Sequence, residues 1–150
     1  MTFLLCLGSN HEPEKQLAFA RQKLMESYPD IRFSHEVETL PIGLRNEAHF
    51  HNQVARFQAD ATIEEVRLRL KHIEQLAGRN SADKQREIIR LDIDLLQADN
   101  QVLKPQDMAR EWMEELLNSQ LKTHNSQLIT LFLSPFQHVI ERFSLSFRNF

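Results

Sequence analysis

The order in which two hydrophobic patterns alternate along residues 1–98 is the feature that most limits the fold of this chain. Segments with the alternation or continuous apolar run of a β-strand, and segments with the spacing of an amphipathic helix, follow in the order strand, helix, strand, strand, helix, strand. This is the order of the split βαβ, or ferredoxin-like, arrangement. The sequence therefore predicts an α+β fold, a ferredoxin-like βαββαβ unit with an antiparallel sheet, with elements at 3–7, 13–28, 31–39, 49–58, 63–77 and 88–96.

Local signals mark the ends of the two helices. Pro13 stands at the start of the first helix, where the missing N–H of proline costs nothing, and Pro29 stops that helix. Thr62, followed three residues later by Glu65, has the form of a capping box. Gly78 follows the second helix at the position where a left-handed residue commonly ends one.

The final third of the chain has a weaker pattern. Residues 127–133 suit either a strand or a buried helix, and Ser134-Pro135 favours the start of a short last helix. Because no repeat or linker is present, we predict a single domain over 1–150, with a core at 1–98 and a C-terminal extension at 99–150 that adds a helical segment. The apolar residues that predict this added amphipathic helix are Met108, Trp112, Leu116, Leu117 and Leu121.

Composition and charge exclude several classes of protein. The formal net charge is −3 and no run of Lys and Arg occurs, so nucleic acid is not an expected partner. No apolar stretch approaches the roughly 18 residues of a membrane span, and the N-terminus lacks the pattern of a signal peptide. A lone Cys6 excludes an internal disulfide, and its apolar surroundings favour a small core residue. We expect a cytoplasmic monomer without membrane contact.

Asp92 and Asp94 form the most specific local pattern. Residues two apart on a strand point to the same face, so the two carboxylates can share a hard cation or hold a neighbouring pair of cations. Magnesium usually takes one or two protein carboxylates and completes its octahedron with water and substrate phosphates. An exposed acidic face on an edge strand is the alternative that the pattern leaves open.

The third predicted strand carries candidate binding residues on both faces. Phe50 and Asn52 share one face, where the ring could stack on a flat heterocycle and the amide could bond its edge. A core Phe and a surface Asn are the alternative. His49 and His51 share the other face, but two histidines without a third ligand do not make a zinc site.

The chain holds only three glycines and none forms a Gly-rich phosphate loop, so a nucleotide would have to be held in another way. Arg79, just after the second helix, is a candidate phosphate contact. It is equally a cation suited to a helix C-terminus.

Five short motifs lie along the predicted frame in a sensible order and spacing. They are Leu7–Asn10, Thr39–Gly43, Phe50–Asn52, Ile73-Glu74 with Gly78-Arg79, and Arg90–Asp94. Together they resemble the 6-hydroxymethyl-7,8-dihydropterin pyrophosphokinases of folate synthesis, and the resemblance covers residues 1 to about 98.

The resemblance implies magnesium-dependent transfer of diphosphate from ATP to the hydroxymethyl group of 6-hydroxymethyl-7,8-dihydropterin, with release of AMP. By the same resemblance, Asp92 and Asp94 would bind two magnesium ions that bridge the ATP phosphates, and Arg79 would complete the catalytic set. The implied partners are therefore small molecules, ATP and the pterin.

The resemblance also implies two sets of binding residues. Asn52 would read the polar edge of the pterin and Phe50 would stack on its ring, while Trp112 is either a second stacking aromatic or the core anchor of the added helix. The implied pterin set is Gly8, Thr39, Pro41, Gly43, Phe50, Asn52 and Trp112. The implied nucleotide set is Glu74, Arg79, Arg86, Arg90 and Arg110.

The sequence departs from the family's pattern in two places. Residues 86–89 replace a Trp-Gly-Pro-Arg stretch, so an expected arginine is Ile89 unless Arg86 or Arg90 substitutes for it. Gln106 stands where the family has the histidine of a Pro-His pair. These departures support a second hypothesis, a pterin- or nucleotide-binding relative with weakened or lost catalysis and a regulatory role.

A third hypothesis is an RNA or protein interaction module, because RNA-recognition domains share this strand and helix order. Such a module requires an aromatic-rich open strand and a basic surface, and the sequence shows neither.

Overall fold

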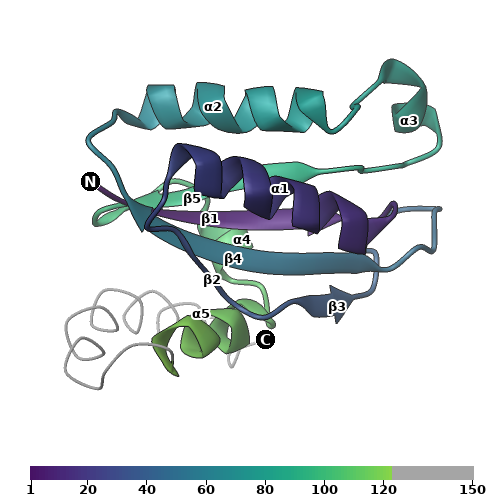
Figure 1. Cartoon of the computed structure of the whole chain (residues 1–150). Coiled ribbons are helices and arrows are strands. Elements are labelled where there is room, and N and C mark those ends of the chain that lie inside the picture. The colour runs from purple at the N-terminus through teal and green to yellow at the C-terminus, as the bar shows by residue number, and fades with distance from the viewer. Residues whose placement is uncertain (123–150) are drawn as a thin grey trace.

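The computed structural model describes residues 1–122 and confirms the ferredoxin-like α+β frame (Figure 1). The predicted elements at 127–133 and from Ser134 lie outside the described residues. In chain order the elements are β1 (Thr2–Ser9), α1 (Pro13–Ser27), β2 (Arg32–Phe33), β3 (Val37–Thr39), β4 (Phe50–Gln58), α2 (Ile63–Leu76), α3 (Ser81–Gln85), β5 (Asp92–Ala98), β6 (Gln101–Val102), α4 (Pro105–Met108) and α5 (Met113–Lys122).

The strands form one antiparallel sheet in the order β2-β4-β1-β5-β6, and β3 also pairs with β4. Strand β1 lies at the centre, where Leu5 is opposite Ala55 of β4 and Leu95 of β5. The strand that begins the chain is therefore flanked by the third and fourth strands of the predicted frame, which is the ferredoxin-like order.

Helices α1 and α2 cover one face of this sheet (Figure 1). Their apolar residues recur every three or four positions, which places them on the side of each helix that meets the strands. The cluster beneath them includes Leu17, Ala20 and Leu24 of α1, Val66, Leu70 and Ile73 of α2, and Phe3, Leu5, Leu7, Ala55, Phe57, Ile93 and Leu95 of the sheet.

Helices α4 and α5 pack on the opposite face, where α5 lies on the other side of the sheet from α1 and α2 (Figure 1). The single helix expected from Met108 onward is in fact two, because the chain turns between Met108 and Met113. Within this turn the Arg110 N–H donates to Asp107 O at 3.2 Å, and both methionines reach the same apolar cluster. The cluster consists of Leu4, Val54, Leu96, Met108, Met113, Leu116 and Leu117.

The strand predicted at 31–39 is interrupted, and Ser34 gives the physical reason. The Ser34 N–H donates to Val54 O at 2.9 Å, but the Val54 N–H donates to the Ser34 hydroxyl, at 3.0 Å. The Gln53 amide donates to Ser34 O at 2.6 Å. Because side chains replace part of the backbone ladder there, the segment forms β2 and β3 instead of one strand.

The helix signals read from the sequence are confirmed. The Glu65 N–H donates to Thr62 Oγ1 at 3.2 Å and the Thr62 N–H donates to Glu65 Oε2 at 2.7 Å, which completes the capping box of α2. Gly78 has φ +90°, the left-handed conformation expected after a helix. No helix within residues 1–122 is long and apolar enough to cross a bilayer.

Glu74 connects α2 to the edge of the sheet. Its side chain is 2% exposed, and Oε1 accepts a hydrogen bond from the Ile93 N–H at 2.8 Å. Strand β6 pairs only with Gln97 and Ala98 of β5, so Glu74 provides a partner on a part of β5 that β6 does not reach. Arg79 is 3.3 Å from the second carboxylate oxygen and partly balances the buried charge.

We expect Glu74→Ala to lower the free energy of unfolding by about 2–3 kcal/mol, because it leaves the Ile93 N–H without this acceptor. Urea unfolding followed by circular dichroism measures this change. Gln75→Ala, at an exposed position beside it, is the matched control and should change stability by less than about 0.5 kcal/mol. An equal loss in the two variants would contradict the assigned role of Glu74.

Candidate functional site

Three strands place one residue each in a row across the sheet. Gly8 of β1 is opposite Asn52 of β4 on one side and opposite Asp92 of β5 on the other. Strand alternation places Phe50 on the same face as Asn52, and Asp94 on the same face as Asp92. The structure thus brings together residues from three motifs on the sheet face opposite α1 and α2.

Gly8 is required by close packing in this row. A Cβ atom built on Gly8 would lie 3.0 Å from Asn52 Oδ1, so any larger residue would push the carboxamide out of place. The missing side chain leaves the room that the carboxamide oxygen of Asn52 occupies. Gly8 therefore shapes the site by the space it leaves.

Asn52 is held by a neighbouring strand. Its side chain is buried, and Nδ2 donates to Thr39 Oγ1 at 2.8 Å. Because Thr39 lies on β3, which pairs with β4, the hydroxyl sets the orientation of the amide. Thr39 and Asn52, both predicted for the pterin set, are in direct contact.

The carboxylates of Asp92 and Asp94 form a strongly electronegative, half-buried pair. Burial, then the negative charges of Asp94 and Glu74, raises the pKa of Asp92 from 3.8 to about 6. Such a pair favours a nearby cation. No three His, Cys, Asp or Glu side chains are grouped as a metal site within residues 1–122. Two carboxylates completed by water and phosphate oxygens are nevertheless a donor set that suits magnesium.

Lys104 supplies a positive charge at this pair, and the sequence interpretation missed it. Its ammonium group forms an ion pair and hydrogen bond with Asp94 Oδ1. Burial works to lower the pKa of Lys104, but the hydrogen bond and the charges of Asp94 and Asp92 outweigh it and raise the pKa. The signal that would have found Lys104 is the short Asp99-Asn100 turn, which folds β6 and the following residues back along β5.

The motif Leu7–Asn10 ends in a side chain that holds a distant loop. Asn10 Nδ2 donates to Glu87 O at 2.9 Å, and Asn10 Oδ1 accepts from the Ile89 N–H at 2.7 Å. The Asn10 N–H donates to Ile89 O at 3.0 Å. These bonds tie residues 87–89 to the end of β1 and explain why β5 begins at Asp92 and not at residue 88.

Glu87 joins the loop at 87–89 to the loop at 40–49, a role that the sequence did not indicate. One carboxylate oxygen accepts the backbone N–H groups of Arg45 at 2.6 Å and of Asn46 at 2.8 Å. These contacts fix the loop that follows β3. Pro41 and Gly43, predicted for the pterin set, lie in this loop, and Gly43 has φ +70°.

Most of the arginines predicted for the nucleotide are engaged with acidic residues. Arg90 donates to both oxygens of Asp83, at 2.6 and 3.2 Å, and these bonds hold the pKa of Asp83 below its ordinary value. Arg79 bonds Glu74 and Arg110 lies 3.6 Å from Asp107. Arg86 is exposed and has no side-chain ion pair among the described residues. Its guanidinium is therefore free to meet a ligand.

Trp112 and Cys6 belong to the apolar cluster on the site's face of the sheet. Trp112 is partly buried and packs against this cluster, as does Cys6. Burial, followed by the charges of Asp94 and Asp92, raises the pKa of the Cys6 thiol well above its ordinary range. Cys6 is therefore a core residue, as expected. The position of Trp112 suits the core-anchor alternative.

The two strand histidines pair with glutamates. His49 Nδ1 lies 2.5 Å from Glu38 Oε1, and His51 Nδ1 lies 3.3 Å from Glu36 Oε2. Each ring thus has its own partner on the neighbouring segment.

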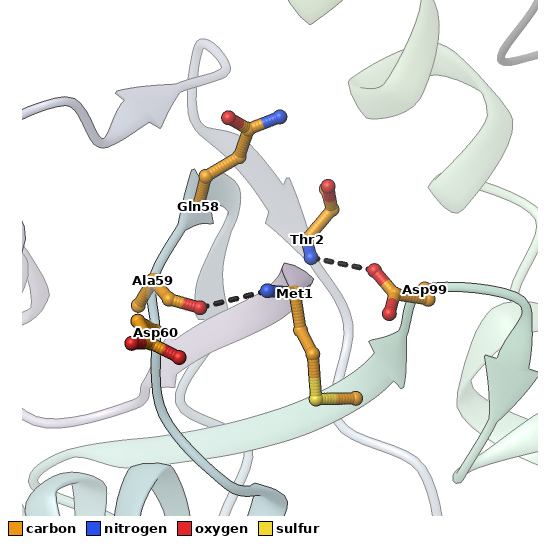
Figure 2. A pocket seen from close by; sticks show the side chains of 6 residues that line it. All are labelled: Met1, Thr2, Gln58, Ala59, Asp60 and Asp99. Carbon is orange, nitrogen blue, oxygen red and sulfur yellow. Dashed lines mark hydrogen bonds between the residues drawn. The ribbon is translucent and has the colours of Figure 1, made fainter.

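A separate depression lies at the other end of β1 (Figure 2). The N-terminal amine of Met1 donates to Ala59 O at 2.8 Å, and the Thr2 N–H donates to Asp99 Oδ1 at 2.7 Å. These bonds close the start of β1 onto its neighbours, so the Met1 amine and the Asp99 carboxylate are used in joining strands.

We expect Asp92→Asn to stabilise the metal-free protein above pH 6. The pKa of Asp92 is about 6 in the folded protein and near 3.8 in the unfolded chain, so the folded state binds this proton more tightly. The stability that this provides is complete below pH 3.8 and is lost as the pH rises through about 6. Asparagine does not titrate. At pH 8 the free energy of unfolding of the variant should therefore exceed that of the unsubstituted protein by about 1–2 kcal/mol.

Urea unfolding in EDTA between pH 4 and 8 measures this difference. Asp60→Asn, at an exposed position beyond β4, is the matched control. A difference in the free energy of unfolding between Asp92→Asn and the unsubstituted protein that stays constant over this pH range would contradict the raised pKa of Asp92.

Comparison with known proteins identifies the family. No protein of curated function matches the sequence. Among solved structures, a de novo designed protein with a ferredoxin fold has 16% identity and a TM-score of 0.28, covering 63% of this chain and 82% of that chain. The family model for 7,8-dihydro-6-hydroxymethylpterin-pyrophosphokinase matches residues 4–122, well past about residue 98, where the resemblance described from the sequence ends. Because that match spans most of the 150 residues, the chain belongs to the HPPK family, whose activity is a pyrophosphoryl transfer in folate biosynthesis.

Proposed function

We propose that this protein transfers diphosphate from ATP to the hydroxymethyl group of 6-hydroxymethyl-7,8-dihydropterin in a magnesium-dependent reaction and releases AMP. The observation that carries the proposal is the row Asn52, Gly8 and Asp92, with Asp94 on the same face. It sets an amide that suits a heterocycle edge and carboxylates that suit a metal on either side of a residue without a side chain.

Asp92 and Asp94 are the residues that would hold magnesium, as two ions in the full proposal. Their half-burial and mutual repulsion support this, because two neighbouring carboxylates with like charge favour a bound cation. Magnesium would neutralise charge on the phosphates and orient them.

The pterin side would be formed by Asn52, Phe50 and the loop after β3. A buried amide already oriented by Thr39 can meet the polar edge of a pterin with little loss of side-chain entropy. Phe50, on the same face, would cover the ring. The exposed apolar side chains of Leu40 and Ile42, 69% and 75% exposed, lie in the adjoining loop.

The nucleotide side would draw on Arg86, together with Arg79 and Arg110 where a phosphate replaces their present carboxylate partners. In the transfer, the hydroxymethyl oxygen attacks the β-phosphorus, the bond between that phosphorus and the α,β-bridging oxygen breaks, and AMP leaves. The hydroxyl proton passes to solvent. Positioning and charge neutralisation carry most of such a reaction.

A second candidate function is a pterin- or nucleotide-binding relative with weakened or lost catalysis. The bidentate bond between Arg90 and Asp83 favours it, because an arginine held by a mostly buried carboxylate is less available to a phosphate. This alternative predicts binding without turnover. Monomeric state, cytoplasmic location and the single domain over 1–150 stay predictions from the sequence.

The decisive test is AMP release by the purified protein with magnesium-ATP, with and without 6-hydroxymethyl-7,8-dihydropterin. We expect pterin-dependent AMP, and a loss of at least about 100-fold in Asp94→Asn, because the variant removes half of the anionic metal ligands. Asp60→Asn is the matched control and should retain full activity. Pterin-dependent AMP from Asp94→Asn at the normal rate would remove the metal assignment, and binding without AMP would favour the second candidate.

Phe50→Ala is expected to weaken pterin binding by roughly tenfold, because it removes an aromatic contact over the ring. Isothermal titration calorimetry with the pterin measures the dissociation constant. His49→Ala, adjacent but exposed on the opposite face, should bind as the unsubstituted protein does. Unchanged affinity in Phe50→Ala would place the pterin elsewhere.

A further inference from the structure

The acidic pair of the site already has a positive charge bound to it, and that charge belongs to the chain itself. The Lys104 ammonium contacts Asp94 Oδ1, one of the oxygens that we propose as a metal ligand. Asp92 and Asp107 also lie near enough to act on Lys104 electrostatically. Arg110, which pairs with Asp107, is the other cation on this short segment.

The backbone of Lys104 is held beside the acidic strand. Both the Leu103 N–H, at 2.8 Å, and the Lys104 N–H, at 3.3 Å, donate to Leu96 O on β5. Pro105 follows and keeps the backbone of Lys104 out of the helical region, with φ −131° and ψ 75°. The base of the lysine is thus fixed close to Asp94 by contacts that do not involve its charge.

The side chain, in contrast, is able to leave. It is 42% exposed, whereas the Asp94 side chain is 27% exposed. A long side chain anchored at its base and open to water at its tip can move away without disturbing the core cluster behind it.

We propose that Lys104 is a tethered counter-cation, which neutralises the Asp92–Asp94 pair in the metal-free protein and must be displaced from Asp94 when a divalent cation binds. This inference rests on the metal assignment of the proposed function. The lysine stabilises a half-buried pair of like charges while the site is empty of metal, and in return it lowers the affinity of the site for free divalent cations.

Competition of this kind is measured directly by titrating Mn²⁺, without nucleotide, and following the free ion by electron paramagnetic resonance. Lys104→Met removes the competing charge and is expected to bind Mn²⁺ about five- to tenfold more tightly than the unsubstituted protein. This range corresponds to an ion pair whose strength lies between that of an exposed pair and that of a buried pair. Lys104→Arg keeps a cation and should bind about as the unsubstituted protein does. Lys23→Met, which removes an ion-paired lysine on α1, is the matched control and should change nothing.

Thermal unfolding in EDTA provides a second readout that does not depend on activity. Lys104→Met should unfold at a lower temperature than the unsubstituted protein, since its two carboxylates lack a counter-charge. Added Mn²⁺ should raise the unfolding temperature of Lys104→Met by more than it raises that of the unsubstituted protein. If Lys104→Met does not fold, Lys104→Gln, which also lacks the positive charge, replaces it in both measurements with the same expected results.

The outcomes separate this inference from the proposed function. Equal Mn²⁺ affinity in Lys104→Met and the unsubstituted protein would overturn the inference, whatever the AMP assay shows. Tighter binding in Lys104→Met, abolished by adding Asp94→Asn, would support it even if no AMP is formed, and the proposed catalysis alone would then fail. No Mn²⁺ binding by any variant would overturn both the inference and the metal assignment.

Discussion

Antiparallel pairing of β1 with both β4 and β5 is the constraint on which the rest of the structure depends. The shared register brings Asn52 and Asp92, which are 40 positions apart in the sequence, to either side of Gly8. The face of β1 that carries Phe3, Leu5 and Leu7 is buried under α1 and α2, and a slip of one residue would turn it away from these helices. The packing that stabilises the core therefore also sets the geometry of the site.

Electrostatics divides the charged residues of the site into two groups. Asp92 and Asp94 are placed so that their repulsion and partial burial favour a bound cation, and Lys104 is near enough to serve as one. Arg90 is instead satisfied by Asp83, which leaves Arg86 as the exposed arginine of that loop. Three of the four arginines expected to contact the nucleotide are thus paired with carboxylates.

Hydrogen bonds from a few side chains connect the loops around the site. Asn10 holds the backbone of residues 87–89, and Glu87 in turn holds the backbone of Arg45 and Asn46. Buried amide and carboxylate groups that satisfy backbone N–H groups are costly to remove, so these loops are coupled to the end of β1. A change in the conformation of one loop should therefore alter the conformation of the other.

The sequence by itself determined the order of elements, the caps of α2, and the shared faces of Asp92 with Asp94 and of Phe50 with Asn52, because these follow from short-range periodicity and local hydrogen bonds. Only the tertiary structure decided the interruption at Ser34, the burial of Glu74 against Ile93, and the approach of Lys104 to Asp94. Each of these depends on which strand lies beside which, and on side chains that replace backbone partners. That information is carried by contacts between distant residues, and no local pattern contains it.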